Sequence, residues 1–174
     1  ESGSYFNELY LLNFISFLFS LGLDYAAIAW ISREPELVPI IHRLLFKVSI
    51  FFLFALLLMS FYILPEVHFR SIQSPIALVF FGFGNILLIL YQGLLSALKQ
   101  FNKQNLILIS TNTIYLLYLF FLNGETASVR EISLSYASLF CIQGLLMVIL
   151  SNPKVQSDNY QLNQKSFFQY GAKI

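Results

Sequence analysis

Five long apolar runs, nearly free of Asp, Glu, Lys and Arg, dominate this chain and constrain its fold. They are Tyr5–Ile31, Leu37–Leu64, Ile76–Leu98, Leu106–Leu122 and Leu134–Leu150. An α-helix needs about 17–25 apolar residues to cross a hydrocarbon core of about 30 Å. Because the bilayer core offers the backbone no water, each N–H and C=O must be satisfied within its own helix. The sequence therefore predicts an all-α, polytopic transmembrane helical bundle over residues 1–150.

The composition also favours a lipid environment. Hydrophobic residues make up 57% of the chain and charged residues 11%, against about 45–50% and about 25% in soluble domains. The net charge of +1 argues against binding to nucleic acid, so the expected partner of this surface is the lipid bilayer. The single cysteine, Cys141, cannot form an internal disulfide, and we expect it to pack as a small apolar residue.

The distribution of Lys and Arg among the polar connections predicts an orientation in the membrane. If the chain weaves back and forth, eight of these residues fall on one side and two on the other. The eight are Arg33, Arg43, Lys47, Lys99, Lys103, Lys154, Lys165 and Lys173, and the two are Arg70 and Arg130. Because Lys and Arg of short loops concentrate in the cytoplasm, residues 151–166 are predicted to be a cytoplasmic linker and Glu1 to lie on the outer face.

Both ends of the chain favour a longer protein. The chain starts on the predicted outer face without an initiator Met, which favours a missing upstream helix or a removed signal peptide. At the other end, residues 167–174 look like the start of a sixth transmembrane helix. We expect an internal piece of a larger transporter. A small, complete five-helix bundle is the alternative.

The first apolar run carries a polar stripe. Asn13, Ser16, Ser20, Asp24 and Ala27 recur at spacings of three and four, which places them on one face of a helix. An acidic residue inside a membrane span costs several kcal/mol unless it is paired, protonated or hydrated. Asp24 is therefore expected either to line a substrate or ion path, or to bind a neighbouring helix near the interface. Both interpretations remain open.

The third run carries a similar stripe, which becomes cationic toward its end. Asn85, Gln92, Ser96, Lys99 and Lys103 share a face by helical spacing. A cavity lined with amides and ending in lysines would suit an anionic headgroup such as a diphosphate. Alternatively, the lysines only follow the positive-inside rule and the amides only join helices. Together the two stripes predict a substrate path lined by Asn13, Ser20, Asp24, Asn85, Gln92, Ser96 and Lys99.

Small and amide residues indicate how the helices contact one another. Gly82, Gly84 and Gly93 are expected to permit close approach between helices, because small side chains favour contact between transmembrane segments. Asn112 and Gln143 are typical of hydrogen bonds between helices.

Signatures of catalysis are absent from the sequence. It contains two histidines, His42 and His68, and no His, Cys or Asp pair with the spacing of metal ligands. It also lacks a phosphate-binding GxxxxGK[ST] motif and a nucleophile with a recognisable base. We therefore expect a protein that is not an enzyme and that needs no cofactor.

Three segments resemble a family of transporters. Gly3–Ser32, with its Leu21-Gly22-Leu23-Asp24 stretch, resembles the second helix of polysaccharide-type flippases, and Tyr91–Asn105 resembles the end of their fourth helix. Phe167–Ile174 looks like the beginning of the seventh. The resemblance spans nearly the whole chain and points to the O-antigen and capsule flippases of the multidrug/oligosaccharidyl-lipid/polysaccharide exporter superfamily. It makes the chain helices two to six of the N-terminal lobe.

The resemblance implies a function and a mechanism. Such a protein moves undecaprenyl-diphosphate-linked oligosaccharide across the bacterial inner membrane for the synthesis of surface polysaccharide. Two six-helix lobes rock around a central cavity in alternating access. The resemblance implies that Asp24, Asn85 and Gln92 face this cavity, and that the partner of the chain is the C-terminal lobe of the same protein.

Other functions remain open. A cation-coupled multidrug antiporter of the same superfamily would use Asp24 as its coupling site. A membrane scaffold without transport activity would use the polar stripes only for packing. A membrane polymerase or ligase is a further alternative, although such enzymes usually carry a large outer loop, and the longest predicted outer loop here has about ten residues.

Overall fold

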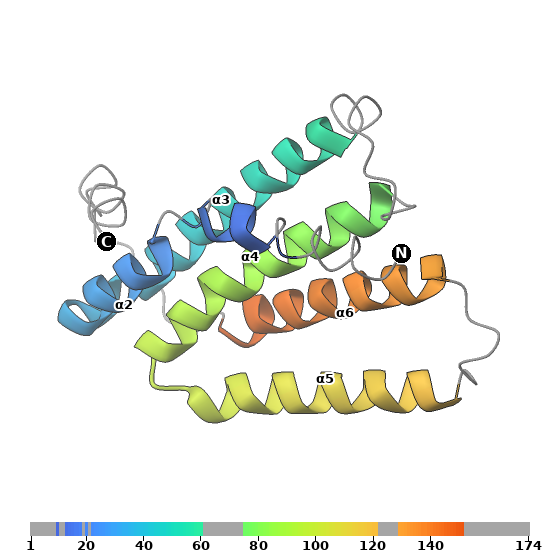
Figure 1. Ribbon diagram of the computed structural model, residues 1–174. Helices are drawn as coiled ribbons and strands as arrows, with labels where there is room; N and C mark the ends of the chain where they lie inside the picture. Colours follow the sequence, from blue (N-terminus) through green and yellow to red (C-terminus); the bar gives the residue numbers. More distant parts are fainter. Residues whose placement is uncertain are drawn as a thin grey trace.

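The computed structural model describes residues 10, 13–18, 20, 22–60, 75–121 and 129–151, and these residues form helices and no strand. The elements are α2 (Leu23–Arg33), the 3-10 turn η1 (Pro35–Leu37), α3 (Val38–Leu58), α4 (Pro75–Ala97), α5 (Phe101–Phe121) and α6 (Val129–Leu150) (Figure 1). Within this part of the chain, five helical segments are long and apolar enough to cross a membrane. The predicted all-helical class is confirmed. The predicted linker and the predicted start of a sixth span lie outside the described residues, apart from Ser151.

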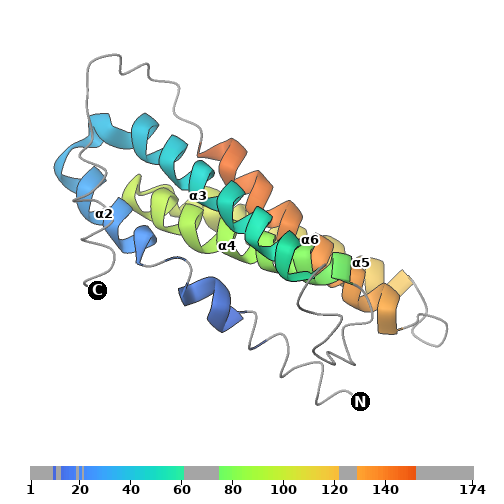
Figure 2. The same ribbon diagram turned by 90° about the horizontal axis from the view of Figure 1, so that it is seen from above.

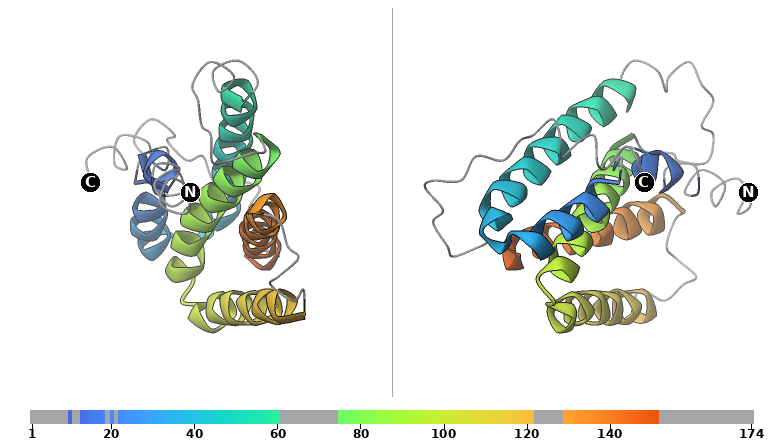
Figure 3. Two further views of the ribbon diagram at one scale, coloured as in Figure 1. Left: turned by 45° about the vertical axis from the view of Figure 1, so that its right-hand side comes forward. Right: turned by 90° about the vertical axis from the view of Figure 1, so that its left-hand side faces the viewer.

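Helix α4 forms the centre of the bundle. It contacts α2, α3, α5 and α6, and in Figure 3 it passes between the α2–α3 pair and α6. Its side chains Leu87, Leu90, Tyr91 and Leu94 are fully buried. A central helix can be apolar on all sides because it faces other helices rather than lipid.

Helix α5 lies at the edge of the bundle. Its main neighbour is α6, which separates it from much of α4 (Figure 1). Ile107 and Thr111 are the buried side chains of α5, and its other residues are exposed or half-buried. Most of the large exposed side chains of α5 are apolar, as expected for a helix that faces lipid.

At three glycines of α4, a different neighbouring helix packs closely against α4. A Cβ on Gly84 would fall on the backbone of Phe140 and Cys141 in α6. A Cβ on Gly82 would lie 2.8 Å from a methyl group of Leu56 in α3, and one on Gly93 would lie 2.7 Å from the Cβ of Asp24. The expectation that these small residues permit close helix contact is confirmed.

The first span is interrupted at Gly22, so the prediction of one continuous helix over Tyr5–Ile31 is wrong at this residue. Gly22 has φ 65° and ψ 18°, a left-handed conformation, and it forms the N-cap of α2. Because glycine has no Cβ, it adopts this conformation at little steric cost. The left-handed conformation interrupts the regular path of the helix at Gly22. Figure 2 shows the short helical piece of residues 13–18 (dark blue) turned away from α2.

Helix α4 ends before its predicted cationic residues. Lys99 has a left-handed φ of 55°, and the backbone N–H groups of Gln100 and Lys99 bond to the carbonyls of Leu95 (2.9 Å) and Ser96 (3.0 Å). This is the Schellman pattern that closes a helix C-terminus. The prediction that Lys99 and Lys103 extend the polar face of α4 is therefore wrong: Lys99 lies in the turn, and Lys103 lies in the first turn of α5.

Two helices begin five residues earlier than the corresponding apolar runs. Helix α5 starts at Phe101 rather than Leu106, and α6 starts at Val129 rather than Leu134. The added first turns are more polar, and polar side chains are compatible with helix geometry where the helix leaves the hydrocarbon core. The α2–α3 connection, the α4–α5 turn and the end of α6 lie toward one end of the bundle (Figures 1 and 2).

Candidate functional site

The first span meets α4 at two residues of its predicted polar stripe, Asn13 and Asp24, and Asn85 is the residue of the second stripe that takes part. We call this contact the polar seam and define it as Asn13, Ser16, Ser20 and Asp24 of the first span together with Asn85 and Gly93 of α4. At one end of the seam, Asn85 Nδ2 donates a hydrogen bond of 2.8 Å to Asn13 Oδ1. Asn85 is buried and Asn13 is exposed, so this bond lies at the edge of the helix contact.

At the other end of the seam, Asp24 packs directly on α4. The missing side chain of Gly93 leaves room for the Asp24 backbone, since a Cβ on Gly93 would lie 2.8 Å from both Asp24 Cα and Asp24 O. Asp24 is half-buried and lies in the first turn of α2, where the helix dipole favours a negative charge. Its Oδ1 is buried and has no hydrogen-bond partner among the described residues.

Two buried serines lie between these ends along the first span. Ser20 Oγ donates to the Phe17 carbonyl over 2.7 Å and is therefore satisfied within its own helix. Ser16 is buried, and its Oγ has no partner in the part of the chain that the structure describes. Leaving a buried polar group unpaired costs about 1–3 kcal/mol, so the seam holds two groups with unused capacity to bind, Ser16 Oγ and Asp24 Oδ1.

The remaining predicted path residues are arranged differently. Gln92 and Ser96 are half-buried on α4, and neither side chain makes a hydrogen bond within the described ranges. Lys99 is exposed in the turn after α4. The structure thus joins Asn13 to Asn85 and Asp24 to α4, and it places Lys99 in the turn beyond the end of α4.

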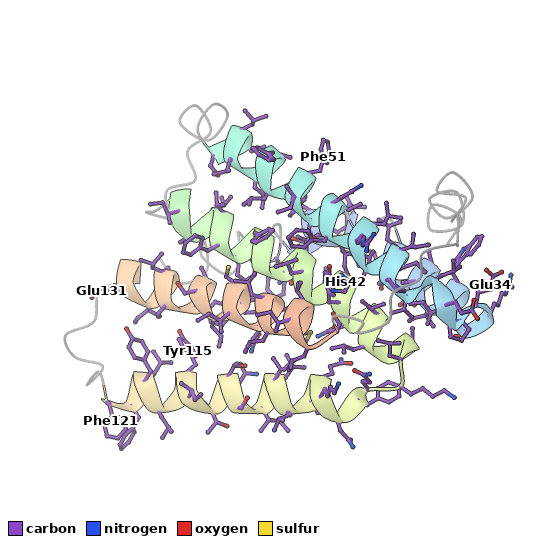
Figure 4. All side chains as sticks on the ribbon, turned by 180° about the vertical axis from the view of Figure 1, so that it is seen from behind. Glu34, His42, Phe51, Tyr115, Phe121 and Glu131 are labelled. Carbon is purple, nitrogen blue, oxygen red and sulfur yellow. The ribbon has the colours of Figure 1, made fainter. Side chains whose placement is uncertain are left out.

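A cluster around His42 joins three helices, and the sequence contained no sign of it. His42 Nε2 lies 3.3 Å from the Val148 carbonyl in α6 and donates to it, and Tyr91 Oη donates to the His42 carbonyl over 3.2 Å. The two rings meet edge to face with centroids 5.2 Å apart. Figure 4 shows His42 on the side of α3 that faces the bundle. Because Val148 lies in the last turn of α6, the cluster fixes that helix end against α3 and α4.

Gln143 forms a second joint, between α5 and α6. Its Nε2 donates to Thr111 Oγ1 over 2.8 Å and to Asn112 Oδ1 over 3.2 Å. Toward the other end of the bundle, Tyr115 of α5 points at α6 and packs on Tyr136 with ring centroids 5.9 Å apart (Figure 4). The interpretation of Gln143 and Asn112 as partners between helices is confirmed, and these residues hold α5 in place.

Cys141 is half-buried in α6, where its backbone contacts Gly84. Across the described ranges, no three residues of the His, Cys, Asp and Glu types come together in a group that could hold a metal ion. The polar seam is thus a set of neutral amides and hydroxyls with one carboxylate, and its chemistry is that of hydrogen bonding.

Comparisons with protein-family models, with curated proteins and with solved structures found no match for this chain. Its candidate site is therefore defined by geometry alone, as a polar seam between the first span and α4 in a helical bundle with the length and apolarity of a membrane protein.

Proposed function

We propose that this chain is part of a flippase that moves an undecaprenyl-diphosphate-linked oligosaccharide across the bacterial inner membrane for the synthesis of surface polysaccharide. The observation that carries the proposal is the polar seam with two unsatisfied groups, Asp24 Oδ1 and Ser16 Oγ. Polar groups inside membrane spans are costly and mark pathways for substrates or ions. The resemblance of the first span and of the end of α4 to polysaccharide flippases supports the same proposal.

The chemistry of the seam suits the sugar part of such a substrate. Sugar hydroxyls donate hydrogen bonds that a carboxylate oxygen such as Asp24 Oδ1 accepts, and hydrogen bonds to charged groups are the stronger kind. Amide groups such as those of Asn13 and Asn85 both donate and accept, as sugar hydroxyls do. The diphosphate carries the same sign of charge as Asp24, so we place it away from the seam, against the other lobe of the transporter.

In this proposal the Asn13–Asn85 hydrogen bond closes the seam when it is empty. Alternating access requires that the polar surface open to one side of the membrane and then to the other. Substrate hydroxyls would replace the amide partners and keep Asn13 and Asn85 satisfied in the open state. The lipid tail would stay in the bilayer throughout.

A cation-coupled multidrug antiporter is the second candidate. The unpartnered Asp24 Oδ1 favours it, because a proton or a cation would satisfy a carboxylate oxygen as well as a sugar hydroxyl would. Both candidates use Asp24, but they predict different effects of gene deletion. Loss of a flippase would cause lipid-linked sugar to accumulate, whereas loss of an antiporter would increase drug sensitivity.

The test uses the intact gene in its native host. The gene is deleted, and undecaprenyl-linked oligosaccharide, surface polysaccharide and sensitivity to a panel of drugs are measured. A flippase predicts accumulation of the lipid-linked sugar and loss of the surface polymer. Complementation with Asp24→Asn should lower polymer export about tenfold or more, the effect of one lost hydrogen bond to a charged group. Asn85→Ala removes a neutral amide and should lower export less, by about two- to tenfold. Asn112→Ala, at the joint between α5 and α6, is the matched control and should restore export.

Three results would contradict the flippase. Unchanged sugars with increased drug sensitivity would assign the antiporter, in which case Asp24→Asn should abolish drug resistance. Full export in the Asp24→Asn and Asn85→Ala variants would leave the seam with a packing role only. A normal phenotype on deletion would favour the scaffold.

A further inference from the structure

The α4–α5 turn carries an isolated positive charge. Lys99 and Lys103 are the only charged residues between Pro75 and Phe121, so neither α4 nor α5 supplies a carboxylate. Both lysine side chains are exposed, and within the described ranges no ion pair involves either of them. Their counter-charge must come from outside α4 and α5.

The turn places the two lysines at a similar depth along the axis of the helix bundle. The Schellman bonds fix Lys99 just beyond the end of α4, and the Lys103 N–H bonds to the Gln100 carbonyl over 3.1 Å at the start of α5. Helix α5 has 21 residues, which at 1.5 Å per residue span about 30 Å, the thickness of the hydrocarbon core. With α5 in the membrane, its first turn and both lysines lie at the level of the lipid headgroups.

Beyond the lysines, α5 carries large exposed apolar side chains along its length. Leu106 and Ile109 are each 67% exposed, and Ile114 and Phe120 continue this surface toward the opposite membrane face. Acyl chains can therefore lie along α5 while their headgroup meets the lysines. A soluble anion would use the charge but not the apolar surface.

We infer that the α4–α5 turn and the adjoining surface of α5 bind a phospholipid with an anionic headgroup, whose phosphate lies between Lys99 and Lys103. This assignment takes Lys99 out of the predicted substrate path, and it does not depend on what the protein transports. Charge complementarity selects the lipid, because Lys and Arg near an anionic membrane surface each contribute about 1 kcal/mol.

The first half of α3 offers a control of equal charge. Its Arg43 and Lys47 are exposed and four residues apart, as Lys99 and Lys103 are. Unlike the α4–α5 turn, the connection that precedes α3 contains carboxylates, Glu34 and Glu36. Removing Arg43 and Lys47 changes the net charge of the protein equally but leaves the proposed lipid site intact.

The experiment reconstitutes the full chain in phosphatidylcholine bilayers and measures, by electron spin resonance, the preference for spin-labelled phosphatidylglycerol over spin-labelled phosphatidylcholine. We expect Lys99→Gln with Lys103→Gln to lower this preference, by about fivefold for each lysine. Arg43→Gln with Lys47→Gln should leave it unchanged. Lys99→Arg with Lys103→Arg should retain it, which separates loss of charge from loss of folding.

An equal loss of preference in the two glutamine variants would overturn the inference, since the attraction would then belong to the overall charge. No loss in the Lys99 and Lys103 variant would overturn it as well. Displacement of the labelled lipid by millimolar glycerol 3-phosphate would show a site for a soluble anion, which contradicts a site built from headgroup and acyl chains together.

Discussion

Two residues of this protein, a glycine and a lysine, have a left-handed backbone conformation that is favourable only for the glycine. Gly22 and Lys99 both have a left-handed φ, of 65° and 55°. Glycine adopts this conformation freely, whereas a residue with a Cβ loses about 1–2 kcal/mol in it. Glycine at the αL position is also the commonest way to end a helix, so Lys99 occupies a place where stability alone would favour glycine.

Replacing Lys99 by glycine should therefore stabilise the protein. We expect Lys99→Gly to raise the free energy of unfolding by about 1 kcal/mol, because the left-handed strain is relieved. The matched control is Lys103→Gly, which should lower it by about 1 kcal/mol, because glycine is unfavourable within a helix. The measurement is unfolding of the purified full chain by sodium dodecyl sulfate, followed by circular dichroism. A loss of stability in both variants would show that Lys99 is held by interactions of its side chain.

Neither left-handed position could be predicted from its neighbours in the sequence. Gly22 lies in an apolar run, and single glycines are common inside transmembrane helices. Lys99 carries no mark of a turn, and its spacing from Gln92 and Ser96 fits a continuing helix equally well. Hydropathy indicates whether a residue prefers water or lipid. The left-handed conformations of Gly22 and Lys99 are instead determined by backbone hydrogen bonds, which hydropathy does not describe.

At the level of the helices, the contact between α4 and α6 depends on backbone proximity. Gly84 meets backbone atoms of α6, while Gly82 meets the end of a flexible leucine side chain in α3. A backbone cannot move aside without displacing its helix, whereas a leucine can change rotamer. The two glycines are two residues apart in one helix, so they form a natural comparison.

We expect Gly84→Ala to lower the free energy of unfolding by about 1–3 kcal/mol, the range for overpacked cores. Gly82→Ala should change it by less than about 1 kcal/mol, since Leu56 can give way. Both are read from the same detergent unfolding curves. Equal effects of the two alanines would mean that α6 shifts to accept a methyl group at Gly84, and the close contact would then carry little of the stability.

Hydropathy predicted the existence of the described helices well and their ends less well. Helices α5 and α6 start five residues before their apolar runs, because first-turn residues such as Asn102 and Lys103 satisfy helix geometry without being apolar. Periodicity also predicted that polar stripes would lie in the first span and α4. The bond between Asn13 and Asn85, and the bond of His42 to the end of α6, depend on which helices become neighbours, and this information is not local in the sequence.

For the whole molecule, two exposed glutamates mark the two ends of the bundle. Glu34 and Glu131 are exposed, and Figure 4 shows them at opposite ends of the bundle. In a Cys141→Ala background, Glu131→Cys should react with a membrane-impermeant maleimide on intact cells. Glu34→Cys should react only after the cells are opened, since Lys and Arg concentrate at its end. The reverse pattern would invert the predicted orientation, and labelling of both residues in intact cells would exclude a weaving topology.

The hydrogen bond between Asn13 and Asn85 can form only after α4 has been synthesised. The two residues are 72 positions apart, so at about 5–20 residues per second roughly 4–14 s separate their emergence from the ribosome. During this interval the first span and α3 can be in the membrane, but α3 makes few contacts with α2, and Asn13 has no α4 to pair with. The arrival of α4 supplies the amide for Asn13, the glycine for Asp24 and the buried face for α3 at once, so the first three spans can pack together only when the third is in the membrane.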